Sequence, residues 1–436
     1  MHGDLPAALG EQQRDLAPQP LGSAGDEHSF DCSGRQERRH LVGIADNCRQ
    51  MQSDSILASP LQALIASAIA RAGGWIGFGD FMRAALYSPG LGYYAHGSAK
   101  FGQMPAGAKG SGRGEGSDFV TAPEMTPLFG RALAAQVAQA LAATETDEMW
   151  EFGAGSGALA LHLLGELNRQ AIPWRRYTIV DVSGSLRARQ REKLAAFEGK
   201  VCWVDQLPAQ MKGVVIGNEV LDAMPVKLLN RTGGVWHERG VAYKSDGFES
   251  DGFSWQDRAT DLRPAVDIEG PQDYLTEIHV EAEGFMRTLA DTLQQGAAFF
   301  IDYGFPEREY YHPERHMGTV MCHRAHLADA NPLADVGQKD ITAHVNFSGI
   351  ALAAQEAGLD VLGYCSQARF LMNCGLLDLL ENASFQDKAM AQKLIAEHEM
   401  GELFKVIGFE KRGALPDSLE PWRPLGFAAG DRTHTL

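Results

Sequence analysis

The segment Trp150-Glu151-Phe152-Gly153-Ala154-Gly155-Ser156-Gly157-Ala158-Leu159-Ala160-Leu161 decides the fold of this chain. An acidic residue is followed by three glycines at alternating positions, and then by a run rich in alanine and leucine. The pattern predicts a strand, a tight turn and a helix. Glycines at such a turn let the backbone approach a ligand closely, and the first turn of the helix directs its free N–H groups at that ligand.

The chemistry of this turn favours one class of ligand over others. Glu151 ends the predicted strand, and a carboxylate there accepts hydrogen bonds from hydroxyl groups and attracts cations. An adenosyl ligand with a positive charge suits it better than one with a pyrophosphate. A nicotinamide-dependent oxidoreductase is a weak alternative, because its turn has the spacing Gly-x-Gly-x-x-Gly. A tight turn that binds nothing is the other alternative.

Composition argues against several classes of function. The chain has 436 residues, 44% hydrophobic and 22% charged, which is enough to bury a large core in one or two domains. A formal net charge of −17 makes it a poor partner for nucleic acid or anionic lipid. No apolar run approaches the ~20 residues of a membrane span. The six cysteines form no Cys-x-x-Cys pair, which fits a reducing compartment without a zinc site.

Residues 1–53 are polar and lack sustained periodicity, so we expect a disordered extension, with Met51 as a candidate start of the chain. This segment has no apolar signal sequence and too many acidic residues for a mitochondrial transit peptide. We therefore expect a cytoplasmic, bacterial protein.

Strands and helices alternate over 146–412, which predicts an α/β fold with a mostly parallel sheet and right-handed crossovers. The expected strands are 148–152, 177–182, 201–204, 213–217, 296–304, 359–365 and 403–409. The expected helices between them are 158–170, 186–197, 280–294 and 347–357, with others near 376–400.

Other segments flank or interrupt this core. Residues 54–145 predict a helical, lid-like segment, with helices from Pro60, at 78–86 and at 127–143, and a Gly/Ser-rich surface loop at 102–117. Alternating polarity and paired turn residues at 227–256 predict inserted β-hairpins. We expect a loop at 305–340 and an irregular tail at 413–436.

The ends of the predicted strands carry polar residues. Because ligands of an open parallel sheet bind outside the carboxyl ends of its strands, these residues are candidates for a binding site. Asp181 is placed to accept hydrogen bonds from two ribose hydroxyls, or else is an acid at a helix N-terminus. Asp205 is placed to accept from an adenine amino group, with Leu207 against the ring, or else is an ordinary loop acid.

The acid-x-Gly-x-Gly-x-Gly turn is similar to motif I of class I S-adenosylmethionine-dependent methyltransferases. The chain resembles the MidA family of these enzymes, which includes the mitochondrial complex I assembly-factor arginine methyltransferases and their bacterial relatives. The residues that carry the resemblance are 86–94, 118–124, 151–157, 218–226, 300–304, 337–347 and 401–406. It extends over about 59–412.

This resemblance implies a Rossmann-like class I methyltransferase fold with a seven-stranded sheet and helices on both faces. It implies S-adenosylmethionine as cosubstrate, held by Glu151, Gly153, Gly155, Gly157 and the strand-end acids, and Asn218 as a candidate for the methionine end. It also implies a protein substrate that presents an arginine, which for the eukaryotic members is a subunit of respiratory complex I. No metal, nucleic acid or membrane insertion is expected.

Methylation of arginine needs carboxylates, because a guanidinium has no free lone pair and a pKa above ~12. Carboxylates hold its N–H groups and localise charge away from the attacking nitrogen. The candidates are Glu219 and Asp222, which share a face if their turn is helical, and Glu124. Glu124 alternatively closes a capping box with Thr121.

Several histidines are candidates for a catalytic base or for metal ligands. His344 is a candidate base, although a hydrogen bond at a helix start is the stronger interpretation. The histidines at 312, 316, 323 and 326 have no supporting carboxylate or cysteine pattern, so we interpret them as loop residues.

Two further functions stay open: methyl transfer to a small molecule, and an assembly chaperone that keeps the cofactor pocket but acts by holding a partner.

Overall fold

The structure is a computed structural model that describes residues 59–95, 121–181, 183–244, 252–324, 327–413 and 422–436. The expected disorder of 1–53 and the Gly/Ser-rich loop at 102–117 lie outside the described residues. No helix in the described ranges is both long and apolar enough to cross a membrane.

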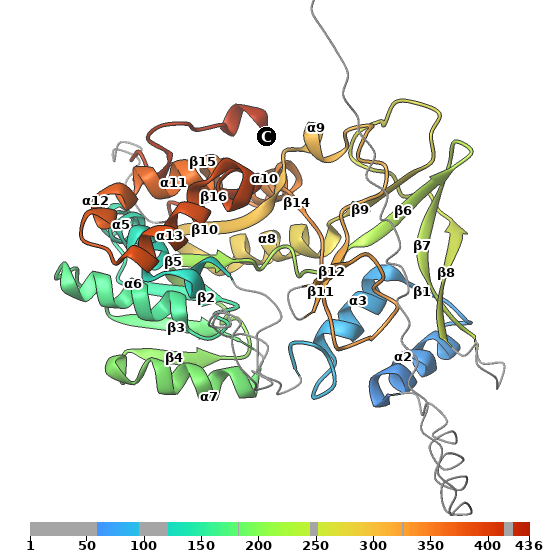
Figure 1. The fold of residues 1–436 in the computed structure, drawn as a ribbon, viewed down its shortest axis with the longest axis horizontal. Coiled ribbons are helices and arrows are strands. Elements are labelled where there is room, and N and C mark those ends of the chain that lie inside the picture. Colours follow the sequence, from blue (N-terminus) through green and yellow to red (C-terminus); the bar gives the residue numbers. More distant parts are fainter. Residues whose placement is uncertain (1–58, 96–120, 182, 245–251, 325–326, 414–421) are drawn as a thin grey trace, which may run out of the picture. The chain divides into compact units, whose positions relative to one another are not determined.

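A mostly parallel sheet forms the core, as the alternating pattern predicts (Figure 1). Its strands follow the order β15-β16-β10-β5-β2-β3-β4, and the short β14 pairs with the end of β10. The strand β16 is antiparallel to both of its neighbours, β10 and β15, and every other pair along this order is parallel. The bounds are β2 Glu148–Phe152, β3 Arg176–Val180, β4 Val201–Val204, β5 Met211–Asn218, β10 Leu293–Phe305, β14 Val345–Asn346, β15 Asp360–Ser366 and β16 Phe404–Lys411.

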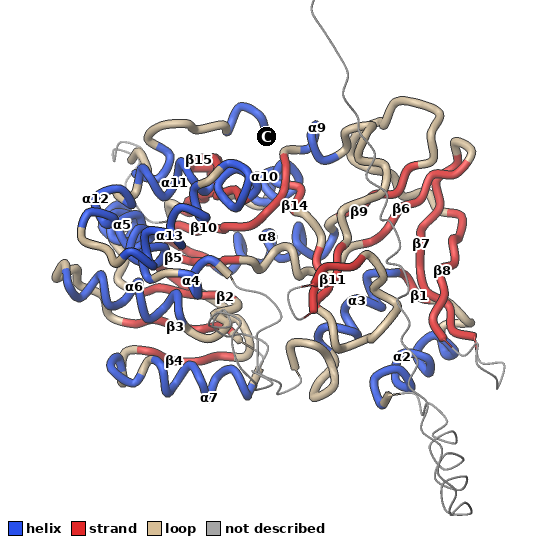
Figure 2. Tube along the Cα trace, in the orientation of Figure 1, coloured by secondary structure: helices blue, strands red, loops and turns tan. Residues whose placement is uncertain are grey.

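Helices cover both faces of this sheet (Figure 2). Side chains alternate between the faces along each strand, so Met149 packs in one apolar cluster and Trp150 in the other. The first cluster includes residues of α5 (Pro127–Ala143), α6 (Ala158–Arg169), α11 (Gln367–Asn373), α12 (Leu376–Glu381) and α13 (Phe385–Ile395). The second includes residues of α8 (Val280–Thr292) and α10 (Phe347–Glu356). The charged helix α7 (Gly184–Lys193) precedes β4.

The predicted hairpins at 227–256 belong to a second sheet with the order β1-β7-β6-β9, in which β8 pairs with β7. Its strands are β1 Ile76–Gly77, β6 Lys227–Thr232, β7 Val235–Lys244, β8 Gly252–Ala259 and β9 Tyr274–Ile278. The helices α2 (Pro60–Arg71) and α3 (Phe78–Tyr87) pack on this sheet, where Ile65 and Phe81 share a cluster with Leu228 and Val241. The N-terminal helices therefore pack with the insertion.

The expectation of a loop at 305–340 is wrong. The described part of this segment holds α9 (Glu307–Tyr310) and a small sheet of β11 (Met321–Arg324), β12 (Leu327–Asp329) and β13 (Asp340–Thr342). These elements have three or four residues each, which is too short to show a period in sequence. The described tail holds only two short 3-10 turns, Leu425–Phe427 and Thr433–Thr435, but Phe427 is buried in the core.

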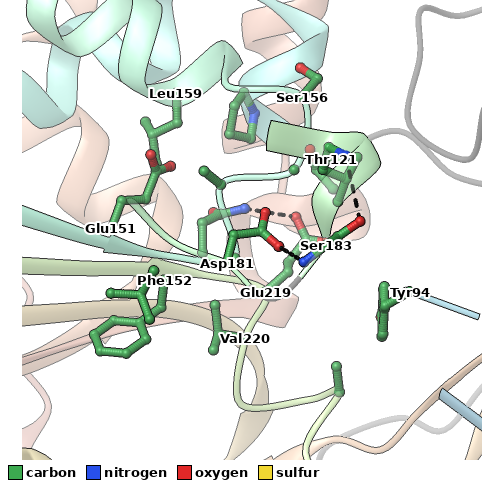
Figure 3. Close-up of a pocket in the computed structure, with 18 of the residues that line it drawn as sticks. Tyr94, Thr121, Glu151, Phe152, Ser156, Leu159, Asp181, Ser183, Glu219 and Val220 are labelled. Carbon is green, nitrogen blue, oxygen red and sulfur yellow. Dashed lines mark hydrogen bonds between the residues drawn. The ribbon is translucent and has the colours of Figure 1, made fainter. Parts of the chain in front are cut away.

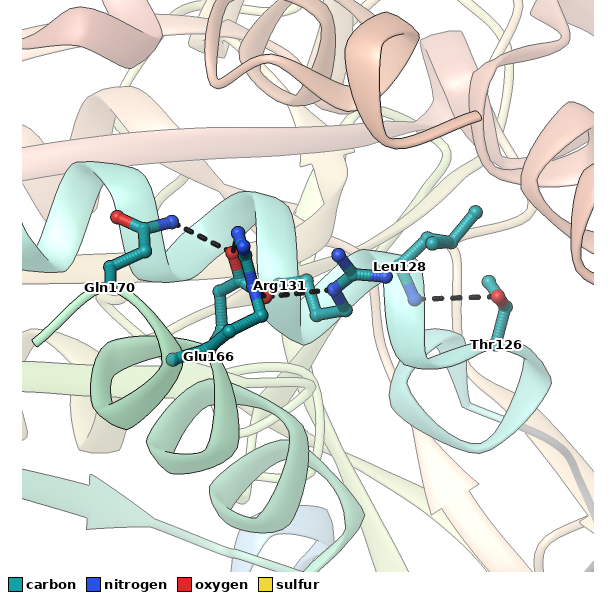
Figure 4. Close-up of polar contacts among 6 residues, drawn as sticks. Thr126, Leu128, Arg131, Glu166 and Gln170 are labelled. Carbon is teal, nitrogen blue, oxygen red and sulfur yellow. Dashed lines mark hydrogen bonds and ion pairs between the residues drawn. The ribbon is translucent and has the colours of Figure 1, made fainter. Parts of the chain in front are cut away.

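A buried carboxylate joins α5 to α6 (Figure 4). Glu166 accepts hydrogen bonds from Arg131 Nε at 2.9 Å, Arg169 Nε at 3.0 Å and Gln170 Nε2 at 2.7 Å. These donors, Arg169 first, lower the pKa of Glu166 to about 2 against the opposing effect of burial. Near the start of α5, the Thr126 hydroxyl accepts from the Leu128 N–H at 3.3 Å and caps the helix.

We expect Glu166→Gln to lower the free energy of unfolding at pH 7 by about 2 kcal/mol, because the neutral amide accepts weaker hydrogen bonds from the two arginines. A folded-state pKa of about 2 lies below the unfolded value, so this stabilisation is complete above about pH 5 and is lost as pH falls toward 2. Urea unfolding at pH 7 and pH 4 measures it. The exposed Glu192→Gln on α7 is the control, and equal stability of the two variants would contradict the prediction.

Candidate active site

The glycine turn between β2 and α6 needs glycine at three positions. Gly153, Gly155 and Gly157 have φ of +61°, +52° and +83°, in the left-handed region that side chains disfavour. A Cβ on Gly153 would lie 3.2 Å from Cγ2 of Val220. The turn therefore brings bare backbone to the carboxyl end of the sheet.

A cavity of about 400 Å³ opens beside this turn, within the size range of small-molecule sites (Figure 3). Its walls come from the glycine turn, the ends of β3 and β5, α8 and the N-terminal segment. Four carboxylates, and no lysine, arginine or histidine, occur among the described residues that line it; the four are Glu124, Glu151, Asp181 and Glu219. The cavity therefore favours a cation.

The two acids nearest the glycine turn are both buried. Glu151 accepts a hydrogen bond from the Tyr177 hydroxyl at 2.8 Å, and burial raises its pKa to about 8. Asp181 accepts from the Ser183 N–H at 2.8 Å (Figure 3). It also accepts from Gln190 Nε2 at 2.9 Å, and burial raises its pKa as well. The Gln190 amide also donates to the Gly155 carbonyl at 2.9 Å, so one side chain joins Asp181 to the turn.

Asn218 ends β5 and lines the cavity. Its Nδ2 donates to Glu219 Oε1 at 3.0 Å, and its Oδ1 is buried without a hydrogen-bond partner among the described residues. A buried acceptor of this kind is expected to meet a donor from a ligand, since buried polar atoms are nearly always hydrogen-bonded. Together with the bare glycine backbone, it fits an adenosyl amino acid.

Glu219 stands in a strained turn that the buried Asp302 holds in place. Glu219 has φ of +53°, which is uncommon for a residue with a side chain. Asp302 Oδ2 accepts the backbone N–H groups of Val220, Leu221 and Asp222 at 3.1, 2.9 and 3.2 Å. Burial raises the pKa of Glu219 to about 8, and burial with two acids nearby raises that of Asp302 well above its usual range.

The turn that carries Glu219 and Asp222 is not helical, so the condition under which they would share a face is not met. Residues 219–226 form a turn, and only Glu219 of the pair lines the cavity. Asp222 is buried next to Tyr303, and burial raises its pKa to about 6. Asp222 therefore does not contact the cavity directly.

Glu124 lines the cavity and accepts a hydrogen bond from the Ser156 hydroxyl of the glycine turn. Lys193 Nζ donates to the same hydroxyl at 2.5 Å. The capping-box alternative is wrong, because the Thr121 side chain caps no helix and Thr126 caps α5. Glu124 is therefore available to the cavity.

Three predicted residues lie elsewhere. Asp205 is exposed, Leu207 packs against an apolar cluster of the core, and neither lines the cavity. His344 does not line it either, and burial lowers its pKa to about 4. The helix-start interpretation of His344 is wrong, since Asn346 caps α10. No group of three potential metal ligands occurs in the part of the chain that the structure describes.

Sequence reasoning missed four residues of this region. Asp302 was recognised only as part of a family segment, and Gln190 lies in a helix of charged residues with no distinguishing pattern. Tyr87 and Tyr94 line the cavity from the N-terminal segment, with ring centroids 5.4 Å apart. The sequence did point to these two tyrosines, because both belong to the segment 86–94 that carries the family resemblance.

Comparisons with known proteins agree with this geometry. A family model described as "Putative S-adenosyl-L-methionine-dependent methyltransferase" matches residues 132–365. A crystal structure of a superfamily member from Burkholderia thailandensis, described as a "likely methyl transferase" and bound to S-adenosyl-homocysteine, is 46% identical to this chain. Its TM-score is 0.79, and the match covers 87% of this chain and 97% of that chain. A native crystal structure of an uncharacterised superfamily protein from the same organism is 44% identical, with a TM-score of 0.76 and the same coverage.

Curated relatives are more distant. The protein arginine methyltransferase NDUFAF7 homolog, mitochondrial, of Caenorhabditis elegans is 24% identical over 403 residues, which cover 83% of this chain and 89% of the relative. Protein arginine methyltransferase NDUFAF7, mitochondrial, of Danio rerio is 26% identical over 386 residues, or 81% of this chain and 85% of the relative. With a family model that matches more than half of its length, the chain belongs to the S-adenosyl-L-methionine-dependent methyltransferases of this family and has their Rossmann-like class I fold.

Proposed function

We propose that the protein methylates arginine side chains of a protein substrate. The observation that carries this proposal is the set of acids in the cavity, whose described lining has four carboxyl groups and no basic side chain. The sulfonium of S-adenosylmethionine and the guanidinium of arginine are both cations, and a site for both needs such an excess of acids. The names of the curated relatives, as protein arginine methyltransferases, support the same acceptor.

We assign the cofactor end of the cavity to the glycine turn and its acids. Gly153, Gly155 and Gly157 let the cofactor lie against the backbone, Glu151 and Asp181 accept from its hydroxyl or amino groups, and Asn218 Oδ1 receives a donor at its methionine end. Asp205 and Leu207 are not assigned to the adenine, because they lie outside the cavity.

We assign the acceptor end to Glu219 and Glu124, with Asp222 and Asp302 as positioning residues behind Glu219. S-adenosylmethionine supplies a methyl group on a sulfonium. Transfer would form a bond from a guanidinium nitrogen to the methyl carbon and break the bond from that carbon to sulfur, whose electron pair stays with the leaving S-adenosylhomocysteine. The nitrogen would lose a proton in this step, and the Glu219 carboxylate is the base assigned to take it. Burial raises the pKa of Glu219 to about 8, so Glu219 must release its own proton when a cation binds beside it before it can act as the base.

The remaining assignments follow from this function. We propose that the described part of residues 54–145, which lines the cavity with Tyr87, Tyr94 and Glu124, contributes the acceptor side of the enzyme on a methyltransferase core of 146–412. We also propose a cytoplasmic location, and a substrate among the subunits of respiratory complex I; the family resemblance implies the substrate only. Cell fractionation addresses the location.

The affinity for S-adenosylmethionine is expected to rise roughly tenfold from pH 7 to 8.5. Burial raises the pKa of Glu151 to about 8, so at pH 7 most molecules carry it protonated and must release that proton to bind a cation. Calorimetric titration at several pH values, in buffers of different ionisation enthalpy, measures affinity and proton release. The α-amino group of the ligand titrates in the same range, so the decisive comparison is with Glu151→Gln, which should flatten the rise. The same slope in both proteins would remove Glu151 from the cofactor end.

Transfer of labelled methyl groups from S-adenosylmethionine to proteins of a lysate that lacks this gene product tests the function. Label on arginine side chains of a protein band, located by mass spectrometry, is the expected result. Label confined to small molecules would replace the proposal with a small-molecule methyltransferase. Cofactor binding without any transfer would favour the assembly chaperone.

A further inference from the structure

A second depression adjoins the cavity and is here called the α3–α8 groove. Its lining comes from the end of α3, the turn after β5 and the exposed side of α8; the residues are Tyr87, Met224, Pro225, Val280, Glu281, Gly284, Phe285 and Thr288. Tyr87, Met224 and Phe285 also line the cavity, so the two depressions share these walls. None of the residues assigned to the cofactor lines the groove.

The groove meets the cavity on the side assigned to the acceptor. Met224 belongs to the turn that carries Glu219, and Tyr87 donates a hydrogen bond from its hydroxyl to the Ala223 carbonyl of that turn at 2.9 Å. A molecule bound in the groove therefore lies beside the turn that holds the proposed base. A free small acceptor could be contained in the cavity alone, whereas a chain that continues on both sides of a target side chain needs a surface of this kind.

We propose that the α3–α8 groove binds the extended backbone next to the target arginine of the protein substrate; this inference rests on the proposed function. The shared walls let a side chain enter the cavity while its backbone stays in the groove. Val280 is 47% exposed on the groove wall, which offers apolar contact. Glu281 and Asp80 together pair with the single Arg83, at 2.5 and 2.6 Å, so this rim carries an excess negative charge that suits a basic peptide.

Gly284 provides a clean way to block the groove. It lies within α8, and a Cβ placed there meets no described atom within 4 Å. A glycine inside a helix is about 1 kcal/mol less favourable than alanine, so Gly284→Leu should preserve the fold while it fills the groove. Gly165 within α6 also has open space at its Cβ, is exposed and lines neither depression. Gly165→Leu is therefore a matched control.

The experiment measures methyl transfer to a dilution series of lysate that lacks this gene product, with the wild type and both variants. For Gly284→Leu we expect the initial rate in dilute lysate to fall at least tenfold and to recover as lysate protein increases, which marks an effect on KM. Its affinity for S-adenosylmethionine should stay within twofold of the wild-type value, and Gly165→Leu should match the wild type throughout.

If Gly284→Leu and Gly165→Leu transferred methyl groups at the same rate at every lysate dilution, the groove would not bind the substrate. The proposed function would be unaffected by that result. A wild-type enzyme that labels small molecules and no protein arginine would overturn both. A loss of rate in Gly284→Leu that persists at the highest lysate concentration would also overturn the groove, because a docking surface changes KM and leaves kcat in place.

Discussion

Gly153→Val is expected to abolish binding of S-adenosylmethionine, with a loss of affinity of at least ~100-fold. Gly153 lines the cavity with φ of +61°, and its Cβ would already lie 3.2 Å from Val220. The two methyl groups of valine would extend further and occupy the space where the backbone faces the ligand. Strain at a left-handed β-branched residue adds about 1–3 kcal/mol of destabilisation. Calorimetric titration with S-adenosylmethionine, after a thermal melt to confirm folding, measures the effect.

A second glycine separates the effect of backbone strain on stability from the effect of the added methyl groups on cofactor binding. Gly199 has φ of +85° and open space around its Cβ, and it does not line the cavity. Gly199→Val should therefore lose comparable stability but bind the cofactor as the wild type does. If Gly153→Val retained wild-type affinity, the glycine turn would no longer be part of the cofactor site.

Glu219→Gln is expected to lower the rate of methyl transfer at least ~100-fold while the affinity for S-adenosylmethionine changes only a few-fold. The amide keeps the size of the side chain and can still accept from Asn218 Nδ2, which donates at 3.0 Å in the wild type. It loses the charge that holds a guanidinium and cannot take its proton, and general bases typically contribute 10²–10⁴-fold. Single-turnover transfer to lysate protein, with labelled methyl, separates this effect from binding.

A glutamate of similar environment is the control for this variant. Glu283 on α8 is half-buried with a pKa raised by burial, and it does not line the cavity. Glu283→Gln should leave transfer unchanged. Full activity of Glu219→Gln would remove Glu219 from the chemistry, and rescue of a deletion strain by an inactive Glu219→Gln would show that the cellular role does not need catalysis.

The fold was predictable from local signals in the sequence. Alternation of apolar strands and amphipathic helices located the core strands to within about three residues, and the three glycines located the turn at its ligand face. Local signals of this kind need no knowledge of which strands are neighbours. Asp181 and Asn218 followed directly, because each ends a strand whose carboxyl end faces the same edge of the sheet.

The predictions for individual site residues failed where their positions depend on the pairing of distant strands or on an unusual backbone conformation. Asp302 holds the turn after β5 only because β10 pairs with β5, and this pairing of distant segments has no local signature. Asp222 would have shared a face with Glu219 if their turn were helical, but the left-handed Glu219 and the three backbone hydrogen bonds to Asp302 give this turn a non-helical backbone. Asp205 was placed by analogy with its strand end, although the exposed end of the edge strand β4 does not reach the cavity.

The packing of the N-terminal helices on the inserted sheet has a consequence for synthesis of the chain. Ile76 in β1 pairs with Val241 in β7, and Phe81 of α3 packs in a cluster with Leu228 and Val241. The helices α2 and α3 therefore leave the ribosome long before their packing partners in β6 and β7 are synthesised, and the glycine turn and its strands emerge in between. A nascent chain arrested before β7 would expose the apolar faces of α2 and α3, which makes it a target for chaperones and for aggregation.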